Sequence, residues 1–321
     1  MLFVESGVEV SIWVPPLVAF VVSFFTSMGG VSGAFLLLPF QVSILGFVSP
    51  AVSPTNMVYN VIAIPAGIYR FLQEGRMAWP LTWLVVIGTL PGVGIGAILR
   101  IRYLLDPRAF KFFVGLVLLY IGVRLAIDLA GKTGRSKGRS AEEDFLQRLR
   151  ATRREEGKRG RRDAGADLQV RTKVFSLSRL SYEFCGQIFD CPTWGVLTLS
   201  FLVGIIGGAY GIGGGAIIAP FLVAIFKLPV YTVAGAALAG TFVTSVFGVA
   251  FYQVIAPYFN AAGLSVAPDW LLGALFGLGG LGGIYCGARI QKYIPARFIK
   301  GVLALIVLTV AVRYVIQFWW H

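Results

Sequence analysis

Long runs without a charged residue constrain this chain more than any other feature. The runs Leu17–Tyr69, Met77–Leu99 and Trp194–Phe226 contain no Asp, Glu, Lys or Arg, and about 20 apolar residues suffice for a helix to cross a bilayer. Only 13% of the residues are charged, roughly half the share in a soluble domain. We therefore predict a multi-pass protein of the cell (plasma or inner) membrane. The chain begins MLFVESGVEV, with acids where a secretory signal has basic residues, so we expect the first apolar run to stay as an anchor.

An internal repeat divides the apolar sequence into two halves. SMGGVSGAFLLLPFQVSILGF (27–47) aligns with GAYGIGGGAIIAPFLVAIFKL (208–228) at a constant offset of 181 residues, and a later match follows a longer loop in the second half. Self-similarity of this kind indicates two homologous structural units. The aligned pairs include Gly30 with Gly211, Gly33 with Gly214, Pro39 with Pro220, Trp79 with Trp270 and Gly96 with Gly287.

A polar linker, residues 131–190, separates the two transmembrane repeats, residues 1–130 and 191–321. It holds more than half of the 28 lysines and arginines, and such a concentration marks a cytoplasmic loop. The net charge of +13 is thus explained by topology, and we do not expect nucleic-acid binding. The linker has too few apolar residues to fold alone, so we expect a solvated tether, with anionic lipid headgroups as an alternative partner. The segment 168–184 alternates as a β-hairpin does, and it could cap the cytoplasmic mouth.

Each half is predicted to contain a helical hairpin of two short arms around the glycine motif, followed by three spans. A single helix over 12–47 would be about 54 Å long, which exceeds the ~30 Å bilayer core, so the arms must fold back. Each half then makes an odd number of net crossings, and the halves are inverted repeats, as in many secondary transporters. Parallel halves with four spans each are the alternative. The predicted fold class is an all-α polytopic membrane protein with about 8 to 10 membrane segments. The expected segments are 12–28, 33–47, 50–72, 80–102 and 109–130, then 194–210, 215–227, 230–253, 270–288 and 299–318.

The basic residues agree with this topology in the second half and disagree in the first. With the linker inside, the loop 254–269 lies outside, and it contains no Lys or Arg, as the positive-inside rule requires. A basic cluster of the first half also falls outside, against the rule. Its members are Arg100, Arg102, Arg108 and Lys111.

Three stretches together resemble the sulfite exporter TauE/SafE family. They are the glycine-rich GGAYGIGGGAIIAPFLVAIFKLPVYTVAGAAL, its first-half partner GGVSGAFLLLPFQVSILGFVSPAVSPTNMV, and YEFCGQIFDC at the end of the linker. The resemblance covers nearly the whole chain except 131–170. It implies a permease for small sulfur-containing anions such as sulfite, sulfoacetate or other organosulfonates. The first half departs from the fuller pattern, with Ser32 where the second half has Gly213 and Ala34 where it has Gly215.

The glycines also predict breaks in membrane helices near Gly33 and Gly214. Glycine interrupts a helix and frees backbone N–H and C=O groups, which is tolerable in a bilayer only where protein or water surrounds the break. The half-helix after the break begins with free N–H groups and the positive end of its dipole, which favour an anion. Close packing of small residues is the alternative. The candidate substrate-binding residues at the breaks are Gly30, Ser32, Gly33, Tyr210, Gly211, Gly213 and Gly214.

Polar, uncharged side chains in the spans complete the predicted site. No span contains Asp or Glu except Asp128 near a span end, whereas cation transporters usually place acids at depth. Asn56 and Asn60 are four residues apart and share a helix face, and Thr241 and Thr244 lie in the corresponding region of the second half. We expect these four side chains to contact the anion. Interhelical hydrogen bonds are the alternative, since buried amides need partners.

These features predict a secondary transporter that moves a small anion by alternating access. Arg70 is a candidate gate charge, with snorkelling to headgroups as the alternative. An anion channel or a non-transporting membrane sensor is the second function considered. We expect no enzyme, metal or cofactor, because the chain has one histidine, His321, no intramembrane carboxylate pair and no nucleotide-binding P-loop. Cys185, Cys191 and Cys286 lack metal-ligand spacing. The expected partners are the anion and the lipid bilayer, and a homo-oligomer is left open.

Overall fold

The computed structural model describes residues 1–3, 5–29, 32–73, 77–130, 170–176, 178–184, 186–260, 264–290 and 296–320. The described chain is mostly helical, with two small antiparallel sheets. The first half contains β1 (Leu2–Phe3), β2 (Val8–Glu9), α1 (Val14–Gly29), α2 (Ala34–Ser43), α3 (Val52–Ala63), α4 (Pro65–Gln73), α5 (Trp79–Arg102) and α6 (Pro107–Leu129). Then follow β3 (Arg171–Phe175), β4 (Arg179–Phe184), β5 (Gln187–Pro192), α8 (Thr193–Tyr210), α9 (Gly214–Phe226), α10 (Val230–Asn260), α11 (Trp270–Ile290) and α12 (Ala296–Trp319).

Six of the described helices are long and apolar enough to cross a membrane, namely α5, α6, α8, α10, α11 and α12. Three shorter apolar helices, α1, α2 and α9, supply the other arms beside the two glycine motifs. The prediction of an all-α polytopic membrane protein is confirmed, and the two glycine motifs lie between α1 and α2 and between α8 and α9. The predicted span 230–253 continues further than expected, because α10 ends only at Asn260.

The predicted single span 50–72 is wrong, because the structure divides it into α3 and α4. The division falls at Ile64, directly before Pro65. Proline has no N–H and cannot donate to the carbonyl of Val61, one turn earlier. The carbonyl of Ile64 instead accepts from the N–H of Gly67 at 2.8 Å, which begins a new helix.

The two halves exchange helices in their packing. α1 of the first half lies along α11 of the second, and α8, the counterpart of α1, lies along α5, the counterpart of α11. The last helices of the halves, α6 and α12, pack on each other. Every one of these contacts joins one half to the other, so the core belongs to both.

Equivalent glycines bring the exchanged helices into backbone contact. On α5, Gly88, Gly92 and Gly96 face the carbonyls of Leu197, Phe201 and Ile205 of α8. On α11, Gly279, Gly283 and Gly287 face the carbonyls of Pro16, Phe20 and Phe24 of α1, and a Cβ at any of the six glycines would lie under 3.0 Å from its carbonyl oxygen. The sequence offsets that align the two halves also relate each glycine and carbonyl of the α5–α8 pair to those of the α11–α1 pair. Small residues every fourth position allow such close approach in membranes.

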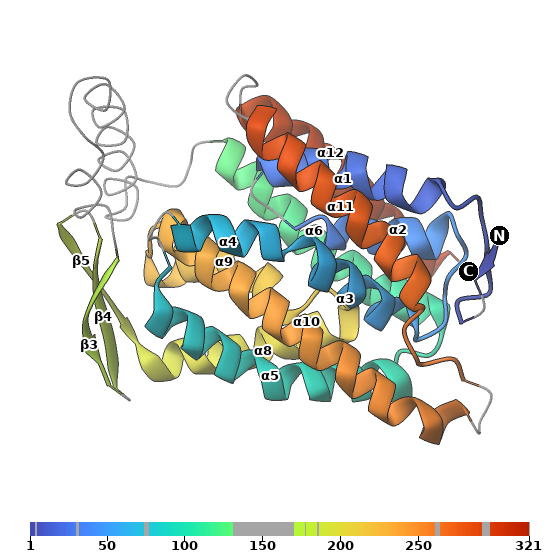
Figure 1. Cartoon of the computed structure of the whole chain (residues 1–321), viewed down its shortest axis with the longest axis horizontal. Helices are drawn as coiled ribbons and strands as arrows, with labels where there is room; N and C mark the ends of the chain where they lie inside the picture. The colour runs from blue at the N-terminus through green and yellow to red at the C-terminus, as the bar shows by residue number, and fades with distance from the viewer. Residues whose placement is uncertain are drawn as a thin grey trace.

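The ends of the chain and the β3–β5 sheet mark opposite ends of the helix bundle. Figure 1 places the N- and C-termini at one end and this sheet, which directly precedes α8, at the other. The first half therefore runs toward the sheet and the second half runs away from it. This arrangement supports inverted halves.

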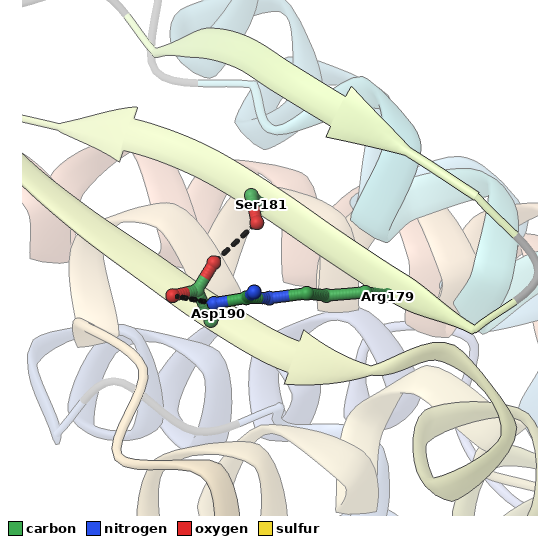
Figure 2. Close-up of polar contacts among 3 residues, drawn as sticks. All are labelled: Arg179, Ser181 and Asp190. Carbon is green, nitrogen blue, oxygen red and sulfur yellow. Dashed lines mark hydrogen bonds and ion pairs between the residues drawn. The ribbon is translucent and has the colours of Figure 1, made fainter.

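The β3–β5 sheet packs on the helices at the end of the predicted linker. Its strands are antiparallel, so the predicted hairpin is confirmed and a third strand, β5, extends it. Tyr182 of β4 is buried in the main apolar cluster, and its hydroxyl lies 2.8 Å from Oγ1 of Thr232 in α10. Toward solvent, Asp190 of β5 accepts hydrogen bonds from Ser181 and from Arg179, the latter at 2.6 Å (Figure 2). The rest of the predicted tether, 131–169, lies outside the described residues.

Arg100 of the unexplained basic cluster is a buried structural residue and not a loop charge. Its guanidinium donates to the carbonyl of Leu104 and, at 3.2 Å, to that of Val48. It also stacks over the ring of Phe110, 3.7 Å from the centroid. Arg100 thus joins the α2–α3 connection to the α5–α6 connection, which removes one of the four violations of the positive-inside rule.

Candidate functional site

The second glycine motif breaks the helix as predicted. Gly211 and Gly213 adopt φ values of +87° and +75°, a left-handed region that glycine occupies readily and other residues rarely adopt. The N–H groups of Gly211 and Ile212 close α8 on the carbonyl of Gly207, at 2.9 and 3.1 Å. α9 then begins at Gly214. The turn leaves the carbonyls of Gly211 and Ile212 outside any helix.

At the first glycine motif, Gly33 has a different role. Gly33 has an ordinary helical φ of −65°, but a Cβ there would lie 2.5 Å from the hydroxyl of Tyr59 and 3.0 Å from that of Ser23. These two hydroxyls are hydrogen-bonded to each other at 2.8 Å. Glycine at position 33 therefore serves close approach. The predicted residue Gly30 lies outside the described residues.

Asn56 of α3 joins the two breaks. Its Nδ2 donates to the carbonyl of Ala34, in the first turn of α2, and to the carbonyl of Gly211, each at 3.0 Å. Its Oδ1 accepts from Nε2 of Gln41 at 3.2 Å. One buried carboxamide thus holds together two motifs that lie 181 residues apart in the sequence.

Asn60 and Tyr210 make further links between the halves. Nδ2 of Asn60 donates to the carbonyl of Ile212 at 3.0 Å and to Oγ of Ser245 at 3.2 Å. The hydroxyl of Tyr210 donates to the carbonyl of Phe35 at 2.8 Å. These are the hydrogen bonds that the alternative interpretation of the polar residues predicted, and contact with a substrate stays a prediction.

Two predicted hydroxyls, one before α2 and one on α10, accept hydrogen bonds from the first residues of the half-helices. Oγ of Ser32 accepts from the N–H of Ala34 at 3.3 Å, and Oγ1 of Thr244 accepts from the N–H of Gly214 at 3.2 Å. Thr241, one turn earlier on α10, bonds back to the carbonyl of its own helix at Ala237, at 2.7 Å. Both half-helices have glycine at the N-cap, Gly33 and Gly213, so the cap residue itself contributes no side chain.

The structure therefore gathers nearly all predicted site residues around the two breaks. Arg70 lies in α4, but its side chain is outside the described part, so the gate charge stays a prediction. Gln41 and Ser53 are additional members that sequence reasoning missed, with Ser53 donating to the carbonyl of Ala209 at 3.1 Å. Gln41 is the single amide in the arm 33–47, whose other polar side chain is Ser43, and this was a usable signal.

The electrostatic character of this region is neutral. Each of the side chains bonded at the breaks is an amide, a hydroxyl or a phenol. Among the described residues no group of three or more His, Cys, Asp or Glu is placed to hold a metal ion. A neutral site can attract a small anion through N–H and O–H groups and also release it.

A separate cavity of about 220 Å³ lies at the start of α6 and the end of α12, and its lining comprises Arg108, Lys111, Tyr314, Gln317 and Phe318. Tyr314 connects it to α2, because its hydroxyl lies 2.5 Å from Oγ of Ser43 and donates to the carbonyl of Pro39 at 3.3 Å. Arg108 and Lys111, two further members of the basic cluster that falls outside against the positive-inside rule, thus line this cavity.

A family model described as sulfite exporter TauE/SafE matches residues 16–314. The chain belongs to the TauE/SafE family. The match includes both glycine breaks and all helices from α2 to α11, and it confirms the resemblance found in the sequence. TauE/SafE proteins are membrane transporters and not enzymes, so this member is a multi-pass membrane protein of a transporter family for sulfur-containing anions. No curated protein and no solved structure gives a significant match.

Proposed function

We propose that this TauE/SafE member is a secondary transporter that exports sulfite, sulfoacetate or another organosulfonate by alternating access. The observation that carries the proposal is the meeting of the two glycine breaks at Asn56 inside the bundle. It brings the N-terminal ends of α2 and α9 to one region. Discontinuous helices that meet near the midplane are where secondary transporters bind their substrates.

The half-helix N-termini supply the attraction for an anion. The first N–H groups of α2 and α9 have no carbonyl one turn earlier in their own helix, and each helix carries the equivalent of about half a positive charge at this end. A sulfite or sulfonate oxygen accepts hydrogen bonds from such groups without a formal cation nearby. Ser32, already bonded to the first turn of α2, can turn its hydroxyl toward the same oxygens, whereas the hydroxyl of Thr244 donates to the carbonyl of Gly240 in its own helix at 2.6 Å.

Alternating access fits the burial of the site. The side chains of Asn56, Asn60, Tyr210 and Thr244 expose none of their surface, so an anion reaches them only after helices move. Inverted halves would provide two equivalent movements, since α1 with α11 and α5 with α8 form matching pairs. Rocking one pair against the other would open the site alternately to the two sides.

Counterflow in liposomes tests this proposal. The full-length protein is reconstituted, and exchange of radiolabelled sulfite is measured for the wild type and for Gly33→Val and Gly214→Val. A Cβ at Gly214 would lie 2.7 Å from Cβ of Thr89, so valine displaces the half-helix start, and we expect a loss of about tenfold or more, equivalent to ~1.4 kcal/mol. Gly301→Val is the control, because a Cβ there meets nothing within 4 Å.

The outcomes separate the candidate mechanisms. Saturable exchange in the wild type and the control, with loss in both break variants that still elute as monodisperse protein, supports the carrier. Wild-type exchange in both break variants would overturn the anion site. A steady ohmic current would indicate a channel, and binding without flux would indicate a sensor.

A further inference from the structure

The cavity between α6 and α12 combines two cations with neutral polar groups. Arg108 and Lys111 line it from the start of α6, and Tyr314, Gln317 and Phe318 line it from the end of α12. The two cations are three residues apart, so they share one face of their helix. None of these described lining residues is an Asp or a Glu. The lining therefore carries a net positive charge.

α6 and α12 form an antiparallel pair, and the cavity lies at one end of it. A Cβ at Gly115, near the start of α6, would lie 2.9 Å from Cβ of Tyr314, near the end of α12. A Cβ at Gly122, further along α6, would lie 2.7 Å from Cδ2 of Leu308, which comes earlier on α12. The start of each helix therefore lies beside the end of the other.

The sequence repeat relates the two ends of this pair. RAFK (108–111) at the start of α6 matches RFIK (297–300) at the start of α12, 189 residues later. At the same offset, VRLAID (123–128) at the end of α6 matches VRYVIQ (312–317) at the end of α12. Both helices thus begin with an Arg and a Lys three residues apart. The last aligned position, however, is an acid in α6 and an amide in α12.

This difference leaves the cavity end more positive than its counterpart. One end of the pair has Asp128 among its residues, whereas the cavity end has Gln317 at the equivalent position. An amide does not offset a positive charge. Asp106, the acid just before α6, caps the helix, and its Oδ1 accepts from the backbone N–H of Arg108 at 3.1 Å. The start of α6 with its cap thus carries two cations and one acid, which favours an anion in the cavity.

The cavity lies at the edge of the bundle, at the level where a membrane has its headgroups. α12 is the least buried of the six candidate spans, and the candidate span of α6 begins at Pro107, directly before Arg108. Trp319 and Trp320 follow the lining residue Phe318 and expose 76% and 81% of their surface. Exposed tryptophans at the end of a span are typical of the boundary between hydrocarbon and water.

The lining suits the phosphate group of a lipid. The guanidinium of Arg108 can donate two parallel hydrogen bonds to a tetrahedral oxyanion, and Lys111 can add a point charge. The amide of Gln317 can donate a further hydrogen bond. The volume of about 220 Å³ is below the ~300–1,000 Å³ of pockets for drug-sized ligands, so it suits one small group. A lipid phosphodiester and free phosphate share this chemistry, and the position at the membrane boundary favours the lipid.

We propose that this cavity binds the phosphate group of an anionic phospholipid through Arg108, Lys111 and Gln317. Basic pockets between transmembrane helices bind anionic headgroups in other membrane proteins. Because the hydroxyl of Tyr314 contacts Ser43 and the carbonyl of Pro39, a bound lipid would hold α12 against α2, the helix that follows the first break. An effect on transport rests on the proposed function, while lipid binding does not.

Thermal unfolding of the purified full-length protein in detergent tests the site. Phosphatidylglycerol, phosphatidylcholine and inorganic phosphate are titrated separately. We expect a saturable rise in Tm with phosphatidylglycerol alone, because its headgroup has a net negative charge. Lys111→Gln should raise the half-saturating lipid concentration by about fivefold or more, which corresponds to ~1 kcal/mol. Arg102→Gln is the matched control, since Arg102 is an exposed cation of the same basic cluster at the end of α5 and is not among the lining residues of the cavity.

A second variant covers the case in which Lys111→Gln fails to fold. Gln317→Asp gives the cavity end the acid that the other end of the pair has, so it should also weaken the response to phosphatidylglycerol. An unchanged response in both variants would overturn the site. Equal effects of the two lipids on the wild type would overturn it too, as would equal losses in Lys111→Gln and Arg102→Gln. A rise in Tm with inorganic phosphate that depends on Lys111, without a rise with phosphatidylglycerol, would overturn the lipid as the ligand.

Flux measurements distinguish this inference from the proposed function. Sulfite exchange is compared in liposomes with and without phosphatidylglycerol, and Lys111→Gln should reduce the lipid dependence more than Arg102→Gln does. Exchange that is indifferent to the lipid would overturn the link to α2 and leave the anion carrier intact. Lipid binding without any sulfite flux would retain the lipid site and overturn the carrier.

Discussion

Replacing Asn56 with leucine tests whether one carboxamide ties the two breaks together. Leucine has a similar size but removes the donors to Ala34 and Gly211 and the acceptor for Gln41. An interhelical hydrogen bond in a membrane is worth about 0.6 kcal/mol on average, and a buried polar group without a partner costs about 1–3 kcal/mol. Three lost hydrogen bonds give about 2 kcal/mol, and three partners left unpaired give about 3–9 kcal/mol. Either loss is a large share of a typical stability of about 5–15 kcal/mol.

Reversible unfolding in mixed detergent and SDS micelles measures this loss. Thr309→Val is the matched control, because Thr309 is exposed on α12 and its hydroxyl bonds to the carbonyl of Leu305 in its own helix. We expect the control to change the free energy of unfolding by less than about 0.5 kcal/mol. If Asn56→Leu also changes it by less than that, the hydrogen bonds of Asn56 do not hold the breaks, and the reasoning is refuted.

Two further predictions concern packing and thiol chemistry. Gly283→Ala should lower the Tm, because the new methyl group would press on the carbonyl of Phe20. Gly282→Ala should leave the Tm unchanged or raise it, since the nearest neighbour of its methyl group would be at 3.4 Å and alanine favours the helix by about 1 kcal/mol. Equal Tm values for the two variants would contradict the close contact of α1 and α11. Burial, with a smaller contribution from Asp190, raises the pKa of the Cys191 thiol to about 12. Because the thiolate is the reactive form, iodoacetamide at pH 8 should modify Cys191 about 100-fold more slowly in the folded than in the unfolded protein. Peptide mass spectrometry measures both rates. Similar rates would show that the thiol is accessible and ionised in the folded protein.

Much of the fold could be predicted because the bilayer restricts the choices. Runs without charge had to be helices, and the repeated glycines had to interrupt them. The split of 50–72 was missed although Pro65 was visible. Proline alone does not decide such a break, since Pro39 and Pro220 lie inside helices. What differs is the packing around each proline, which a single sequence does not contain.

Most residues of the candidate site could be predicted from the sequence, but their hydrogen-bond partners could not. The spacing of Asn56 and Asn60 placed both on one face of a helix, which is a local property. Which carbonyls they meet depends on the contact between α3 and the second break, and that contact joins distant parts of the chain. Gln41 and Ser53 were missed for the same reason, because their roles depend on Asn56 and on the carbonyl of Ala209.

The exchange of helices between the halves has a consequence for how the chain is made. α1 leaves the ribosome long before α11, the helix it packs along, which comes after all but one of the other described helices. The glycine-lined surface that receives α1 does not exist until the second half has been inserted as far as α11. Neither half can complete its own interior during synthesis. A nascent chain that stops before α11 would leave α1 in the lipid without its partner and exposed to membrane quality control.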